Sequence, residues 1–131
     1  MKERAAITVT VERFASKPYD QSGGPALIEV NLVETFAGDV DAKGTARALQ
    51  VVRKDRVIEY VAIERVRGRV GEREGSFVLQ GPGRVEDGKV EGQWSVVAGS
   101  GTDELAGMRG EGRFEGEVGK ASHAVLEYWF E

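Results

Sequence analysis

Apolar and polar residues alternate with a period of two along most of the chain. Near the N-terminus, Ile7, Val9 and Val11 are separated by polar residues. Such alternation is typical of strands that bury one face. Seven further segments show the same pattern between turn-forming residues: 26–36, 46–52, 56–69, 76–85, 89–98, 108–118 and 122–131. The pattern therefore predicts eight strands.

The segments between these strands are rich in turn-forming residues. Asp87-Gly88 predicts a tight hairpin, because a type I′ turn needs positive φ at both central positions. Residues 102–106 predict a single helical turn that begins at Thr102 or Asp103 and ends at Gly107. Eight sequential strands with short links favour an up-and-down antiparallel barrel, which leaves no exposed sheet edge. We expect an all-β, eight-stranded antiparallel β-barrel that forms one domain over residues 1–131.

Side chains that alternate along a strand point to opposite faces of the sheet, which predicts the residues inside the barrel. In the fourth strand, Tyr60 and Glu64 share a face with small and apolar residues. Trp94 lies on the apolar, glycine-containing face of the sixth strand, and Tyr128 lies on the apolar face of the eighth. The glycines on these faces leave room beside the aromatic rings, for packing or for a ligand.

Composition narrows the functions that such a barrel can have. The 131 residues are 40% hydrophobic and 31% charged, with 18 glycines, one histidine and no cysteine. Disulfides and thiolate chemistry are excluded, and a zinc site lacks its usual ligands, so we expect no metal and no cofactor. The net charge of -4 argues against nucleic acid as a partner. With no signal peptide or apolar span visible, we expect a cytoplasmic protein that does not bind membranes.

Several stretches resemble a bacterial family of uncharacterised small proteins whose fold is that of the allene oxide cyclase barrel. The stretches are GSGTDELAGMRG at 99–110, KPYD at 17–20, IERVRG at 63–68, GSFVLQ at 75–80 and LEYWFE at 126–131. Plant dirigent proteins carry a related Gly-Thr…Gly…Arg-Gly stretch. The motifs span nearly the whole chain in the right order. Two positions depart from the family: Gly81 follows Gln80 where a histidine is common, and Trp129 replaces an acidic residue.

The resemblance implies a barrel that binds a hydrophobic small molecule and steers its chemistry. Allene oxide cyclase isomerises and cyclises a fatty-acid epoxide in its lumen, and dirigent proteins orient radical coupling. For this chain, such activities are expected only from the analogy of fold. The resemblance also leads us to expect a homo-oligomer (dimer or trimer), with Trp129 as a possible subunit contact.

Glu64 is the candidate catalytic residue, because its strand position directs a carboxyl group into an apolar lumen. Burial raises the pKa of such a group and suits it to act as a general acid or base. The alternative is a structural role, in which an arginine such as Arg47 or Arg109 neutralises Glu64. His123, the one histidine, is expected on the outer surface.

Candidate ligand-binding residues are those that would give the lumen aromatic walls and a few polar groups, as small-molecule sites have. They are Tyr60, Gln80, Trp94, Tyr128 and Arg109. Three functions remain open at this point. They are a cofactor-independent isomerase or cyclase, a non-catalytic carrier or scavenger of a hydrophobic ligand, and an oligomeric interaction module whose lumen is fully packed.

Overall fold

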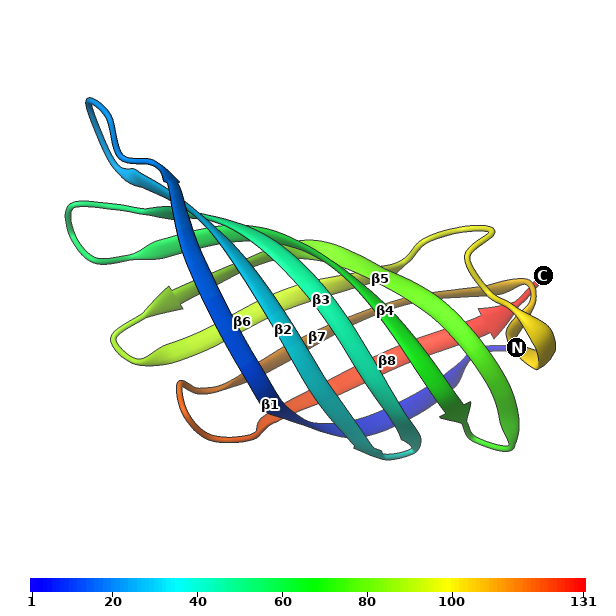
Figure 1. The fold of residues 1–131 in the computed structure, drawn as a ribbon. Coiled ribbons are helices and arrows are strands. Elements are labelled where there is room, and N and C mark those ends of the chain that lie inside the picture. Colours follow the sequence, from blue (N-terminus) through cyan, green and yellow to red (C-terminus); the bar gives the residue numbers. More distant parts are fainter.

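The computed structural model describes residues 1–131 as a closed, eight-stranded antiparallel barrel (Figure 1). Each strand pairs with its neighbours in sequence, and β8 pairs with β1 to close the sheet. The predicted fold class is confirmed. The strands are β1 (Glu3–Asp20), β2 (Ala26–Gly38), β3 (Val40–Val52), β4 (Ile58–Val70), β5 (Arg73–Glu86), β6 (Lys89–Val96), β7 (Met108–Glu117) and β8 (Ser122–Phe130).

The first strands are longer than the sequence predicted. Strand β1 continues through Pro18 to Asp20, and only Asp39 separates β2 from β3. The short β2–β3 link is possible because Gly38 adopts φ +106° and the Asp39 amide donates to the Ala6 carbonyl of β1. The predicted Asp87-Gly88 hairpin is confirmed, since both of its residues have positive φ.

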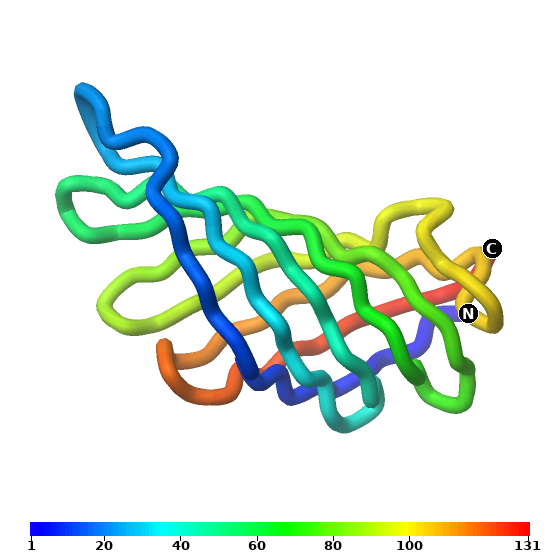
Figure 2. The backbone as a smooth tube through the Cα atoms, in the orientation of Figure 1, coloured from blue at the N-terminus to red at the C-terminus, as the bar shows by residue number.

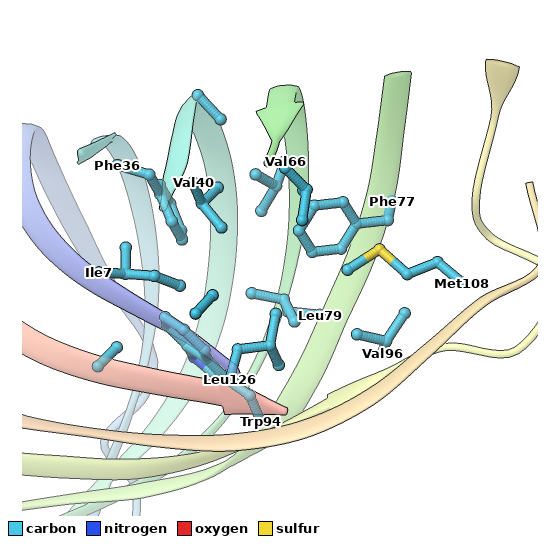
Figure 3. Close-up of a cluster of buried hydrophobic side chains, with 14 of the residues drawn as sticks. Ile7, Phe36, Val40, Val66, Phe77, Leu79, Trp94, Val96, Met108 and Leu126 are labelled. Atoms are coloured by element: carbon cyan, nitrogen blue, oxygen red, sulfur yellow. The ribbon is translucent and has the colours of Figure 1, made fainter. Parts of the chain in front are cut away.

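A hydrophobic core fills the interior from the middle of the barrel towards the end that holds both termini (Figure 3). The buried aromatic residues of this core are Phe36, Phe77 and Trp94, and the half-buried Phe114 packs against it. The ring centroids of Phe36 and Trp94 are 5.8 Å apart, and those of Trp94 and Phe114 are 5.3 Å apart. Around them pack aliphatic side chains from every strand except β2, such as Leu126 of β8. Because burial of this kind is the main source of folding free energy, this half of the barrel stabilises the fold.

The link between β6 and β7 covers the end of the barrel that holds both termini, and it contains the chain's single helical turn, η1 (Asp103–Leu105). Leu105 is fully buried in the core. Thr102 ties the link to β5, because its hydroxyl accepts a 3.0 Å hydrogen bond from the Ser76 amide. The predicted helical turn at the rim is confirmed. No helix of the chain has the length and apolar character needed to cross a membrane.

The opposite end carries a two-stranded ribbon formed by β1 and β2 (Figures 1 and 2). Strand β1 pairs with β8 only over Glu3–Val9, whereas its pairing with β2 continues to Asp20. A β-bulge between Val11 and Arg13 accompanies this separation. The bulge and Pro18 interrupt the free edge of the ribbon, which limits its pairing with another chain.

Candidate functional site

Val30 of β2 and Ala48 of β3 are buried at the ribbon end, but the inward-facing side chains of β4 to β7 are only half-buried there. They include aliphatic and aromatic residues from β4 to β7, namely Ile58, Tyr60, Ala62, Val85, Val90 and Phe114. We call this part of the lumen the open end. Because these residues face the lumen and still reach solvent, the open end presents an apolar surface to molecules outside.

Two glutamate side chains lie inside the barrel where the open end meets the core. Glu64 of β4 is only 6% exposed, and Glu34 of β2 is half-buried. The two carboxyl groups lie close enough for each to shift the pKa of the other. They come from strands that flank β3, so the side chains meet across it. No third His, Asp or Glu joins them in a group that could hold a metal ion.

Gly44 of β3 makes room for this carboxyl pair. A Cβ atom at position 44 would lie 2.9 Å from Cδ of Glu64 and 2.9 Å from the Phe36 ring, too close for either group to stay in place. The Oε2 atom of Glu64 is fully buried and has no hydrogen-bond partner. A buried polar atom without a partner is costly, and a catalytic role is one of the reasons for which proteins keep one.

The pair holds a proton at neutral pH. Burial, the charge of Glu34 and the hydrogen bond with Glu34 raise the pKa of Glu64 to about 10. Burial also raises the pKa of Glu34, although the hydrogen bond with Glu64 opposes this shift. The two carboxyl groups therefore hold a proton between them. Two carboxyl groups that share a proton titrate as a unit.

Tyr60 lies beside the pair and faces the open end. Its ring packs directly over Gly83 of β5, where a Cβ atom would overlap the ring. Burial raises the pKa of Tyr60, and the negative charges at Glu34 and Glu64 raise it further. The phenol therefore stays neutral and can donate a hydrogen bond close to the carboxyl pair.

The ribbon extends the apolar surface of the open end. Through their pairing, Val11 lies opposite Glu34 and Phe14 lies opposite Leu32, so both point to the lumen side of the sheet. The bulge makes this possible, because its extra residue brings Phe14 back to the same face as Val11. Phe14 is 61% exposed. Phe14 therefore continues the apolar lumen side of the sheet onto the ribbon.

The structure brings together only part of the predicted site. Glu64 and Tyr60 are neighbours in the lumen, as predicted. Trp94 also faces inward, but it is buried in the core and stacks on Phe36. Tyr128 lies at the opposite end of the barrel, where its ring packs edge-on against Phe130.

Two predicted ligand-binding residues lie on the outer surface. Gln80 is exposed and pairs with the outward-facing Ile63, because Phe77 and Leu79 take the inward positions of β5. The placement of Gln80 in the lumen was therefore wrong. Arg109 forms an ion pair with Glu131 at 3.2 Å.

Neither arginine that the sequence offered as a partner for Glu64 contacts it. Arg47 pairs with Glu29 at 3.2 Å on the outside of the barrel, and Arg109 is likewise engaged elsewhere. The partner is Glu34, which the sequence reasoning missed. The signal was present in the inward face of β2, where Glu34 alternates with Leu32 and Phe36.

Two depressions of about 450 and 490 Å³ lie on the outside of β5 to β8, bordered by Arg4 of β1 and Glu59 of β4. Their linings mix acidic and basic side chains, including Glu91 and Arg113, with few apolar ones. His123 is exposed, as predicted, and lines one of them. An apolar ligand finds a better match at the open end than in these charged depressions.

The fold and the buried carboxyl pair define a class: a small antiparallel barrel with a packed half and an open half. Residues 5–130 match the model of the family described as "Protein of unknown function (DUF3224)". The chain belongs to this family. A search of curated proteins finds no match.

Among solved structures, the chain is similar to a crystal structure of a DUF3224 protein of unknown function from Shewanella oneidensis MR-1. The two share 29% sequence identity with a TM-score of 0.77, over 100% of this chain and 98% of the other. The resemblance to an uncharacterised family is thereby supported. The wider likeness to allene oxide cyclase stays a prediction.

Proposed function

We propose that this protein binds a small, mainly apolar molecule at the open end of its barrel. The observation that carries the proposal is the protonated Glu34–Glu64 pair, buried beneath an apolar surface that reaches solvent. A solvent-exposed carboxylate would ionise at neutral pH, whereas this pair keeps a proton in an apolar environment. The ligand would carry a carbonyl, epoxide or hydroxyl group that interacts with the pair and with Tyr60.

We propose further that the pair catalyses an isomerisation or cyclisation of this molecule. One carboxyl group gives a proton to one ligand atom while the other takes a proton from a second atom. In an isomerisation a double bond moves between these atoms, and in a cyclisation a new ring bond forms. The ligand is neither oxidised nor reduced in either case, so no cofactor is required. A shared proton suits the pair to this exchange, since one group is already an acid and the other a base.

Native mass spectrometry of the freshly purified protein, before and after denaturing extraction, tests for a bound molecule. A retained small molecule of mainly apolar character is the expected result, and its structure would define the substrate class. Its chemistry would also show whether acid–base isomerisation is feasible.

A neutral fluorescent probe, N-phenyl-1-naphthylamine, tests the location of the site. The Val85→Trp variant places a large ring at the open end and should abolish probe binding. The matched control is Glu86→Trp, because Glu86 is the next residue of β5 and is exposed. Equal probe binding by both variants would contradict the proposed location.

The Glu64→Gln variant separates an enzyme from a carrier. The amide keeps the size of the side chain but cannot transfer a proton, so an enzyme would bind the extracted molecule and fail to convert it. A carrier would bind it unchanged and show no conversion in the wild-type protein either.

A further inference from the structure

The outer face of β3 and β4 carries an apolar patch that no part of the chain covers. Val61 is 58% exposed, Ile63 is 60% exposed and Leu49, which pairs with Val61, is 47% exposed. Pro82 of β5 lies on the other side of Val61 and is also exposed. Large aliphatic side chains gathered in this way on a soluble surface mark an interaction site.

Opposite charges stand at the two ends of this patch along β4. Glu59 precedes the two aliphatic residues and Arg65 follows them, and all four side chains point outward. The four residues are therefore spaced symmetrically about position 62, and the two outer residues carry opposite charges. Glu59 accepts a hydrogen bond from Arg53 through Oε2, whereas Arg65 forms no ion pair within the chain.

This order matches the requirements of a two-fold contact between identical chains. In such a contact both copies use the same patch. If residue i of the first copy contacts residue j of the second, then residue j of the first copy also contacts residue i of the second. If the two β4 strands face each other antiparallel, Val61 of one copy lies over Ile63 of the other. Glu59 then lies over Arg65 at both ends.

The alternative parallel arrangement is disfavoured by charge. It would place Glu59 over Glu59 and Arg65 over Arg65, and like charges at an interface cost free energy and exclude wrong arrangements. In the antiparallel arrangement Leu49 lies over the aliphatic stem of Arg47, which extends the apolar contact onto β3.

We propose that the protein forms a two-fold symmetric homodimer through the outer face of β4, with antiparallel β4 strands and reciprocal Glu59–Arg65 ion pairs. The contact lies on the outside of the barrel and leaves the open end free in both copies. The dimer therefore forms whether or not a ligand is bound.

Sedimentation and light scattering of the wild-type chain should give twice the chain mass of 14.2 kDa. A monomeric or trimeric wild-type protein would overturn the proposal. The Val61→Asp/Ile63→Asp variant should be monomeric. The matched control is Val118→Asp. Val118 is 61% exposed, which is close to the exposure of Val61 and Ile63, but it lies in the β7–β8 turn, so this variant should remain dimeric.

Charge reversal tests the antiparallel arrangement itself. The Glu59→Arg and Arg65→Glu variants should each weaken self-association about tenfold or more, because each brings like charges together at both ends. When the two variants are mixed, all four facing charges are opposite, so a heterodimer should form. Circular dichroism would first establish that each variant is folded. Failure of the mixed, folded variants to associate would overturn the proposed arrangement.

Discussion

Replacing Glu64 by glutamine should change how the stability of the protein depends on pH. The pKa of Glu64 is raised from an ordinary value of 4.5 to about 10 on folding. Between these values the folded chain holds a proton that the unfolded chain releases, so the free energy of unfolding falls as pH rises. The stabilising contribution is complete below the unfolded pKa and is lost as pH approaches the folded pKa.

The slope is about 1.4 kcal/mol per pH unit for one retained proton, or about 4 kcal/mol between pH 5 and pH 8. That change is a large part of the roughly 5–15 kcal/mol that stabilises a typical domain. Glu34 acts in the same direction, since its pKa is also raised. The Glu64→Gln variant keeps a neutral hydrogen-bond donor at all pH values. It should match the wild type near pH 5 and exceed it in stability at pH 8.

Urea unfolding at a series of pH values, followed by tryptophan fluorescence, measures this difference. Trp94 lies in the core and reports its loss. The control variant is Glu115→Gln, because Glu115 is an exposed carboxylate on the outer face of β7 and should leave the wild-type slope unchanged. Parallel stability curves for the wild type and Glu64→Gln would refute the reasoning, because Glu64 would then not hold its proton on folding.

Three further substitutions and one control variant, Gly24→Ala, test separate parts of the structure. Gly44→Ala should lower the free energy of unfolding by about 1–3 kcal/mol through overpacking against the carboxyl pair. Gly24→Ala, where a Cβ meets nothing within 4 Å, should be nearly neutral in the same urea titration. Leu105→Ala should cost about 2–5 kcal/mol, because it opens a cavity under the loop that covers the core; a change in Tm of a degree or less would contradict this role. Phe14→Ser should reduce binding of N-phenyl-1-naphthylamine while changing stability by no more than about 0.5 kcal/mol, since the ring is exposed; unchanged probe binding would remove the ribbon from the site.

The inward face of β4 was predictable because it depends on local alternation. In β4 the sequence places Tyr60, Glu64 and Val66 on one face, and the structure directs all three into the lumen. A strand with one buried face has its side-chain directions specified by the period alone. The closed barrel followed from eight such strands joined by short links.

The partner of Glu64 was not predictable by the same reasoning, because it depends on register between distant strands. Glu34 lies thirty positions away along the sequence, and its meeting with Glu64 requires β3 between them and the absence of a side chain at Gly44. The direction of Phe14 was hidden for a related reason. A β-bulge shifts the alternation of β1, and neither the bulge nor the early departure of β1 from β8 has a clear local signal.

The inner face of β3 explains how one barrel accommodates both a core and a site. Four successive inward positions of this strand carry small residues, Ala42, Gly44, Ala46 and Ala48. Small side chains contribute little burial, so this strand adds less hydrophobic stabilisation than its length allows. In the packed half, aromatic rings such as Phe36 fill the space that these residues leave. Towards the open end, the same space is taken by two carboxyl groups that destabilise the fold unless they keep a proton.

A chain selected for stability alone would place aliphatic side chains there, as proteins commonly gain stability when a buried polar cluster is replaced. The retention of the pair beside solvent is therefore best explained by a function at the open end.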